Sequence, residues 1–416
     1  MEMKNKTVSC KRKLDEISRF PLIELNQDLL EKVLSWLPTS SFFRLTSVSK
    51  KWKSIANSPT FNLACSDVPN RQPWFLMVPS QPHKKTRPTI IFDSSEKNWK
   101  NLKTPPFQDL IPVAASGGLV CFRHAASALI FTVANPVTAS SRQIPSPQLT
   151  QPILAVAMVS KSSSSENFKI VLVSGELPNL EFIRYSSGTD QWGENIVLTR
   201  KPDESGKPTA SDGGDDCARY FLSKCGNVVS TDIQRSPSKQ FSSVLLTAGN
   251  GDEILHFLSS SGTIVSCNLT RRFFFEYPRI LPVFSEYSID LVEVGGEMLV
   301  VLLSEFLDTA SVRVWKWDDK MLTWRQVAAM PPFMSHKFYG KKADVNCAGA
   351  AGEGIVFVCV SSEEMCSYVM CDLGANEWAE LPECWVDGEV NEFVTAFSFE
   401  PRIEASVWGA QRNLKV

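Results

Sequence analysis

Histidine is scarce in this sequence. The chain has 416 residues and only four histidines (His83, His124, His256 and His336), each at least 41 residues from the next. Because histidine is the commonest acid, base and metal ligand near neutral pH, this spacing disfavours a local histidine-based site. The sequence also lacks a phosphate-binding glycine loop, a G-x-S-x-G elbow and an H-E-x-x-H helix. It therefore predicts no enzyme, no cofactor and no metal.

Charge and hydropathy exclude further classes. Lys and Arg total 43 against 45 Asp and Glu, so no basic excess indicates a nucleic-acid partner. No run of about 18 uncharged apolar residues predicts a membrane span, and the first 20 residues lack the apolar core of a secretory signal. The 11 cysteines form no C-x-x-C pair, which indicates reduced, mostly buried thiols. We expect a protein of the cytoplasm, the nucleus or both.

Aromatic residues, in contrast, are plentiful, with 11 Trp and 25 Phe. The chain divides by pattern into five parts. Residues 1–20 are a disordered basic tail, 21–63 carry helical periodicity, and 64–89 are a linker that includes the first strands. Residues 90–408 alternate short apolar runs with turn residues, as an all-β domain does, and 409–416 are a tail.

The helical part predicts three short helices. Apolar residues from Leu25 to Leu37 recur at spacings of three and four, with Asn26 as N-cap and Pro38 as the end of the helix. A second helix is expected over about 40–45. A third is expected over about 46–57, with Val48, Trp52 and Ile55 on one face. So small a unit has little core and is expected to share its apolar face with a partner.

These residues carry a resemblance. Leu37-Pro38, the Val48–Trp52 pair and the closing Ser58-Pro59-x-Phe61 fall in the order of an F-box, although Asn26 replaces the usual proline. The resemblance implies a small all-α unit of three helices that docks on Skp1, and through it on a cullin. The resemblance also implies that eight residues either form the helix core or contact Skp1, without saying which does which: Leu25, Leu29, Val33, Leu34, Leu37, Pro38, Val48 and Trp52. An unrelated fragment of a helical bundle is the alternative.

The β part contains a repeat. A strand, a polar turn, a tryptophan and a second strand recur at Trp99, Trp192, Trp324 and Trp378, with Arg142 and Phe274 in the same place in two weaker copies. The intervals are 43, 50, 82, 50 and 54 residues, which predicts a kelch-like β-propeller of six four-stranded blades. Each blade would bury its aromatic against the next, and 393–401 would pair with the first blade and close the ring. A β-sandwich is the alternative.

The combination resembles plant F-box/kelch-repeat proteins. It implies a non-catalytic substrate-recognition subunit of an SCF ubiquitin ligase, in which the propeller binds an unknown protein target. Two alternatives stay open: an enzyme built on the propeller, and an F-box scaffold that acts outside ubiquitination.

Two loops are candidates for contact with a partner. Residues 199–216 have almost no apolar side chain and are expected to be exposed. The segment 332–347 combines aromatic and cationic residues, as interface loops do, and its candidate substrate-face residues are Phe333, Met334, His336, Lys337, Phe338 and Tyr339. The alternative for this segment is a connector whose aromatics pack inward.

Overall fold

The computed structural model divides the chain into two compact units, residues 1–68 and 69–416. It describes residues 26–79, 88–102, 109–160, 167–201, 220–222, 228–230, 241–259, 262–280, 287–306, 308–350, 352, 354–386 and 388–408. No helix in this part of the chain is long and apolar enough to cross a membrane.

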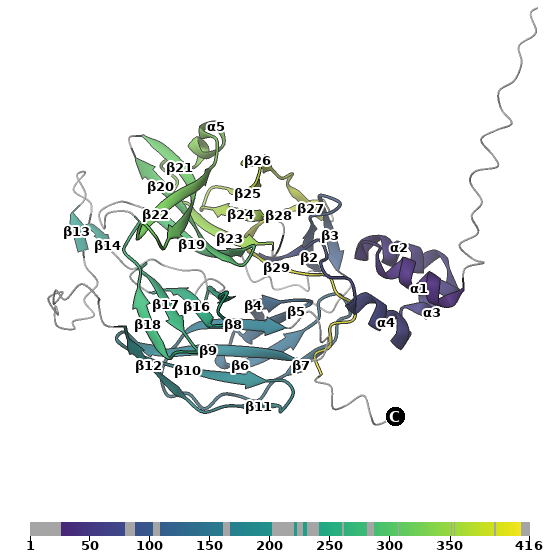
Figure 1. Cartoon of the computed structure of the whole chain (residues 1–416). Helices are drawn as coiled ribbons and strands as arrows, with labels where there is room; N and C mark the ends of the chain where they lie inside the picture. Colours follow the sequence, from purple (N-terminus) through teal and green to yellow (C-terminus); the bar gives the residue numbers. More distant parts are fainter. Residues whose placement is uncertain are drawn as a thin grey trace, which may run out of the picture. The chain divides into compact units, whose positions relative to one another are not determined.

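The first unit is helical, with four helices among its described residues. They are α1 (Gln27–Ser35), α2 (Thr39–Val48), α3 (Lys50–Ile55) and α4 (Pro59–Ser66) (Figure 1). Asn26 is the N-cap residue of α1, as predicted, although its side chain makes no capping hydrogen bond. Helix α1 ends at Ser35, before the predicted end, and Pro38 is instead the N-cap residue of α2.

The prediction of a single third helix over 46–57 is wrong. Ser49 is extended (φ −136°, ψ 121°) and separates α2 from α3, and its side chain accepts a hydrogen bond from the backbone N–H of Trp52 at 3.4 Å. Val48 and Ile55 therefore do not share a face, since Val48 is exposed and Ile55 is buried. The fourth helix was not predicted. It begins at Pro59, whose fixed φ suits the first helical turn.

A small core holds the four helices together. Leu30 and Leu34 of α1 are buried, as are Phe42 of α2 and Phe61 of α4. The Phe42 and Phe61 rings stack with their centroids 4.9 Å apart. These residues leave much of the apolar surface of α1 and α2 in solvent.

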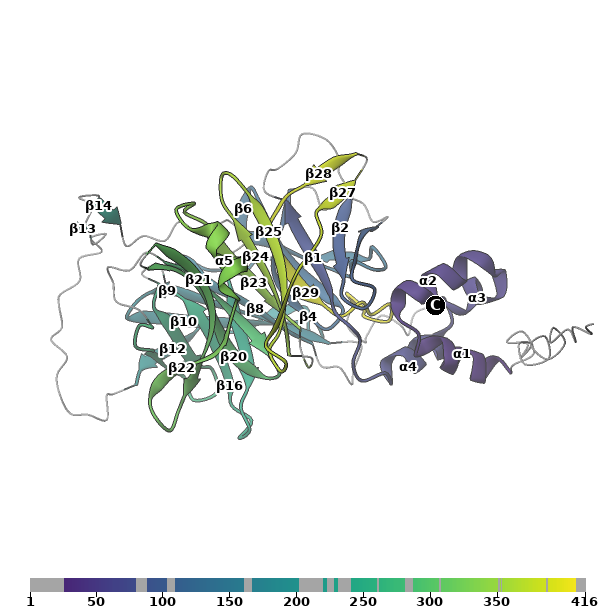
Figure 2. The same ribbon diagram turned by 90° about the horizontal axis from the view of Figure 1, so that it is seen from above.

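The second unit is an all-β propeller, as predicted, and its described residues form six blades, of which the third has five strands and the others four (Figure 1, Figure 2). The first blade contains β29 (Phe393–Phe399), β1 (Trp74–Pro79), β2 (Thr89–Asp93) and β3 (Asn98–Leu102), and the second contains β4 (Leu110–Ser116), β5 (Leu119–His124), β6 (Ser127–Ala134) and β7 (Ser141–Gln143). The third contains β8 (Ile153–Ser160), β9 (Phe168–Glu176) and β10 (Asn179–Ser186), with β11 (Gln191–Trp192) and β12 (Ile196–Arg200) both paired with β10, and the fourth contains β15 (Ser243–Thr247), β16 (Glu253–Leu258), β17 (Ile264–Asn268) and β18 (Phe273–Glu276). The fifth contains β19 (Tyr287–Val294), β20 (Glu297–Phe306), β21 (Thr309–Asp318) and β22 (Thr323–Ala329), and the sixth contains β23 (Asp344–Gly349), β24 (Ile355–Ser361), β25 (Cys366–Asp372) and β26 (Glu377–Glu380).

Several elements stand between or beside the blades. Helices α5 (Pro332–Ser335) and η2 (His336–Phe338) connect the fifth blade to the sixth. Two hairpins, β13 (Tyr220–Leu222) with β14 (Val228–Ser230) and β27 (Cys384–Val386) with β28 (Glu389–Asn391), form separate two-stranded sheets. Strand β12 also pairs in parallel with β18, so it joins the third blade to the fourth.

The C-terminal strand closes the ring, as the sequence predicted. Strand β29 pairs antiparallel with β1, with Trp74 opposite Phe399 and Val78 opposite Thr395. The following residues, 400–408, form a C-terminal strap. Arg402 donates to the carbonyl of Pro69 at 2.9 Å, and the side-chain amide of Asn135 donates to the carbonyls of Arg402 and Ala405, each at 2.9 Å. The two ends of the unit are thereby tied to each other and to the second blade.

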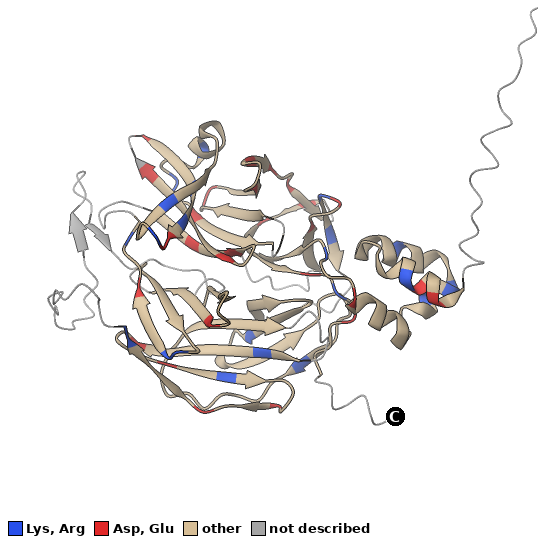
Figure 3. Cartoon of the chain, viewed as in Figure 1, with Lys and Arg blue, Asp and Glu red and all other residues tan. Residues whose placement is uncertain are grey.

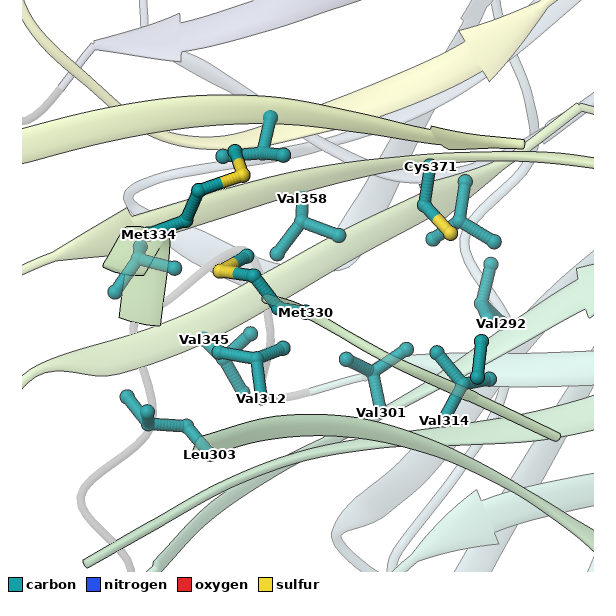
Figure 4. Close-up of a cluster of buried hydrophobic side chains, with 14 of the residues drawn as sticks. Val292, Val301, Leu303, Val312, Val314, Met330, Met334, Val345, Val358 and Cys371 are labelled. Atoms are coloured by element: carbon teal, nitrogen blue, oxygen red, sulfur yellow. The ribbon is translucent and has the colours of Figure 1, made fainter. Parts of the chain in front are cut away.

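The core of the propeller consists of the interfaces between blades. Six clusters of buried apolar side chains occur among the described residues, one between each pair of neighbouring blades. Figure 4 shows the cluster between the fifth and sixth blades, where Val301 and Val314 pack with Val358 and Cys371. Such a ring has no single centre, so its stability depends on every blade having two neighbours.

One turn is repeated around the ring between the third and fourth strands of the blades. In five blades an Asp or Asn side chain accepts hydrogen bonds of 2.8–3.3 Å from the N–H groups two and three residues later: Asp93, Asn135, Asn268, Asp318 and Asp372. Such bonds are the usual reason for Asp and Asn in turns. The fourth residue after each has a positive φ, and in all but the second blade the predicted aromatic follows two positions later.

Paired glycines form the turn between the first two strands of the fifth blade. Gly295 and Gly296 form the turn between β19 and β20 with φ of 62° and 79°, and an added Cβ at either would meet nothing within 4 Å. They are needed for conformation, because side chains disfavour positive φ. Close approach does explain Gly118, where a Cβ would lie 2.7 Å from the Cβ atoms of both Arg402 and Ala405 in the strap.

The repeated tryptophans link blades in pairs. The indole N–H groups of Trp99, Trp192 and Trp324 donate to the carbonyls of Pro382, Pro145 and Pro278, at 2.9, 2.7 and 2.7 Å. Each acceptor lies just after the outer strand of the preceding blade, whereas the sequence predicted contact with the next blade. The indole of Trp378 instead donates to Asn376 in its own turn, at 3.3 Å.

This difference gives a matched test of the links between blades. Trp324→Phe removes the donor but keeps an aromatic ring, so we expect the free energy of unfolding to fall by about 1 kcal/mol, the usual net value of one hydrogen bond. Trp378→Phe removes only a bond within one turn and should cost less. Denaturant unfolding of the two variants measures the difference, and equal losses would contradict a bond that joins blades.

Candidate docking surfaces

Helix α1 carries two apolar stripes, and only one faces the core. Leu30 and Leu34 are buried, while Leu29 and Val33 are 55% and 46% exposed. Trp36, the C-cap residue of α1, continues the outer stripe with 62% of its surface exposed. Spacings of four and three residues place Leu29, Val33 and Trp36 on one side of the helix. We call this set the outer stripe.

The predicted Skp1-docking residues differ in how far the structure exposes them to solvent. Leu34 is buried in the helix core, so it is not available to a partner, and Leu37 and Trp52 are half-buried. Leu29, Val33, Pro38 and Val48 are exposed, and Val48 is 77% exposed. Leu25 lies outside the described residues.

Three exposed apolar residues of this unit were missing from the predicted docking set. Trp36, Phe43 and Leu63 each keep more than a third of their surface in solvent. Large apolar side chains that gather on the surface of a small unit mark a contact surface. The sequence signal was present for Trp36, whose spacing from Val33 matches the outer stripe.

The predicted substrate-face segment splits between the interior and the surface. Met334 and Phe338 are buried in the cluster between the fifth and sixth blades, so for these two the inward-packing alternative is correct. Phe333, His336 and Tyr339 are exposed, with Phe333 82% exposed. The His336 and Tyr339 rings are nearly parallel, with their centroids 6.3 Å apart.

Polar contacts fix the exposed part of this segment. Lys337 pairs with Glu380 of the sixth blade and donates to the Ser367 hydroxyl at 3.0 Å, so this cation is already engaged. The Tyr339 hydroxyl donates to Asp308 of the fifth blade at 2.7 Å. Phe333 is then the side chain of this segment with the largest free apolar surface. Of the other predicted loop, 199–216, the structure describes only residues 199–201.

The described residues show no grouping of three or more His, Cys, Asp or Glu side chains that could hold a metal ion. Their eight cysteines are free thiols, six of them buried. Burial raises the pKa of Cys267 and Cys371 to about 12 each, which keeps both protonated and weakly reactive at neutral pH. Within this part of the chain the prediction of mostly buried thiols is confirmed.

Comparison with known proteins agrees with this architecture. Residues 22–63 match the F-box domain, and residues 91–343 match the KIB1-4 beta-propeller. F-box only protein 13 of Arabidopsis thaliana is 49% identical, over 94% of this chain and 86% of that protein. F-box only protein 6 of the same plant is 26% identical, over 87% of this chain and 70% of that protein.

A third Arabidopsis relative bears on the predicted repeat type. An F-box/kelch-repeat protein is 24% identical, over 92% of this chain and 88% of that protein. The kelch designation thus comes from a distant relative, while the propeller itself matches the KIB1-4 type. The chain belongs to the plant F-box proteins, with an N-terminal F-box followed by a KIB1-4 β-propeller.

Proposed function

We propose that this chain is the substrate-recognition subunit of an SCF ubiquitin ligase. The F-box would dock on a Skp1-type protein and, through it, on a cullin, while the propeller holds a target protein. The observation that carries the proposal is the outer stripe of α1, an apolar surface on a unit too small to bury it.

The mechanism we propose is proximity. A target held by the propeller is kept near the ubiquitin-loaded enzyme on the cullin, which raises the effective concentration of its lysines. The chain needs no catalytic group of its own for this role. Its contribution is to bind two partners at once with enough rigidity to keep them together.

The structure selects the variant that tests docking. Leu34→Ala would damage the helix core, because Leu34 is buried, so loss of binding would be ambiguous. The double change Leu29→Asp, Val33→Asp alters only exposed positions. We expect it to weaken Skp1 binding about a hundredfold, since burying two carboxylates in an apolar contact costs about 3 kcal/mol or more. Pull-down and calorimetry with purified Skp1 measure the effect.

A matched control lies on the propeller. Val197 of β12 and Met321 are also exposed, so the double change Val197→Asp, Met321→Asp introduces the same charge at comparable surface positions. It should bind Skp1 as the unmodified chain does. Full Skp1 binding by the folded double variant would rule out docking through the outer stripe. Skp1 binding without cullin assembly would instead favour an F-box scaffold that acts outside ubiquitination.

A further inference from the structure

The last blade and the hairpin after it have an unusual charge distribution. Residues 343–401 contain twelve Asp and Glu and no Lys or Arg, although the whole chain has nearly equal numbers of both. This stretch forms the sixth blade, the β27–β28 hairpin and the closing strand β29. Figure 3 shows acidic residues along these elements.

The β27–β28 hairpin presents an apolar pair to solvent. Trp385 and Val390 lie directly opposite each other in the two strands, and they are 63% and 41% exposed. The next pair, Cys384 and Asn391, is buried. Because side chains alternate along a strand, one face of the hairpin packs on the propeller and the other presents the indole to solvent. No other strand of the described chain pairs with this hairpin.

Carboxylates flank the exposed pair along the chain. Glu383 precedes β27, Glu389 begins β28 and Glu392 follows it, and all three side chains are exposed. Two lysines between β22 and β23 pair with other carboxylates: Lys337 of η2 with Glu380, and Lys341, which follows η2, with Glu364 at 3.5 Å. These two cations are therefore already engaged.

The hairpin lies at the same end of the blades as the α5–η2 segment. Consecutive strands of a blade are antiparallel, so connections between blades lie on the face opposite the repeated Asp and Asn turns. The hairpin and the α5–η2 segment are both connections of this kind. The exposed Phe333 and Trp385 thus lie on the same face of the propeller.

We propose that the β27–β28 hairpin binds a lysine- and arginine-rich segment of the protein that the propeller holds. Three properties favour such a partner. The Trp385 indole is an exposed apolar anchor, its ring face attracts a guanidinium or ammonium group, and the surrounding carboxylates attract cations over a longer range. An acidic or nucleic-acid partner would be repelled. The inference rests on the proposed function, because it assigns the chemistry of the target.

The test uses the full-length chain and labelled peptides of equal length and apolar content, in which Glu is exchanged stepwise for Lys. Fluorescence anisotropy should show binding that strengthens with positive charge and weakens with salt. Trp385→Ala should reduce the affinity of the most basic peptide at least about tenfold, as loss of an interface anchor does. The double change Glu383→Gln, Glu392→Gln should reduce it several-fold and flatten the salt dependence.

A matched control separates local charge from net charge. Glu176 and Glu194 are exposed in the third blade, so Glu176→Gln, Glu194→Gln makes the same net change far from the hairpin in sequence. It should leave peptide binding unchanged. Equal binding of acidic and basic peptides, or equal losses in the two double variants, would overturn the proposal. So would binding that appears only after deletion of residues 1–20, because the basic tail would then be the occupant.

Skp1 binding, measured on the same proteins, keeps the two proposals distinguishable. The hairpin variants should bind Skp1 normally, since every substitution lies in the propeller. A chain that binds basic peptides but not Skp1 would contradict the ligase role and would still support the proposed hairpin site. A chain that binds Skp1 but shows no preference for basic peptides would contradict the hairpin site and would still support docking on Skp1.

Discussion

A chain that ends at Glu392 is expected to lose the cooperative unfolding transition of its propeller. The truncation removes β29, which supplies the innermost strand of the first blade, together with the C-terminal strap. Strand β1 would then present an unpaired edge, and three of the six interfaces between blades would lose part of their packing. An open ring also exposes strand edges to other chains, so aggregation should accompany the loss.

The expected magnitude explains why the whole fold should fail. Phe393, Phe399 and Val407 are each at most 2% exposed. Burying three such side chains contributes about 5–9 kcal/mol, within the range of the total stability of a typical domain, about 5–15 kcal/mol. Loss of the β1–β29 hydrogen bonds adds to this cost. Truncation should therefore abolish folding rather than lower the melting temperature by a few degrees.

Two further chains locate the effect. A chain that ends at Trp408 keeps the strand and the strap and should unfold as the full chain does. A chain that ends at Glu400 keeps β29 but loses Arg402 and its bond to Pro69, and it should have intermediate stability. Calorimetry and tryptophan fluorescence follow all three. A normal transition in the chain that ends at Glu392 would show that β29 is dispensable for closure.

Ring closure is among the features that could be predicted from the sequence. The aromatic at the start of each outer strand recurs because each blade needs the same contact with its neighbour, so the repeat reveals the number of blades. The Asp and Asn turns recur for a similar reason, since each must satisfy the same backbone N–H groups. Strand β29 was predictable because an apolar run remained after six copies had been counted.

The division of the F-box surface could not be predicted in the same way. Leu29 and Val33 have the same helical spacing as Leu30 and Leu34, so periodicity identifies a helix with two apolar stripes and does not say which one is buried. Contacts with α4, which was itself not predicted, make that choice. Helix α4 has only eight residues, which is too few turns for its periodicity to be distinctive. In the sequence, Pro59 stands out only as part of the Ser58-Pro59-x-Phe61 motif, which does not by itself indicate a helix.

The elements between blades were the least predictable. Their residues do not repeat, because each connection is shaped by its own surroundings. Met334 and Phe338 look like interface residues in the sequence and are core residues in the structure, whereas Trp385 belongs to no repeated pattern in the sequence and is exposed. Burial at such positions depends on which neighbouring blade lies beneath them, which no local pattern encodes.

Acidification is expected to destabilise the propeller through His256. This residue lies in β16, and its ring is 6.0 Å from that of Tyr277. It is 5% exposed, and its Nδ1 atom has no hydrogen-bond partner among the described residues. Burial lowers the pKa of His256 from 6.5 to about 4. Protonation in the folded state would place a charge in an apolar interface between blades, beside the aromatic ring of Tyr277.

The sign of the effect follows from proton binding. Between pH 6.5 and 4 the unfolded chain binds a proton at His256 that the folded chain does not, so the free energy of unfolding falls as the pH falls. The loss should reach about 3 kcal/mol near pH 4 and vanish above pH 7. His256→Met removes the titration while keeping a side chain of similar volume, so its stability should fall less steeply over this window. His336→Gln, at the exposed surface, is the control and should keep the slope of the unmodified chain. Denaturant unfolding at several pH values measures the slopes, and identical slopes for His256→Met and the unmodified chain would show that His256 does not set the pH dependence.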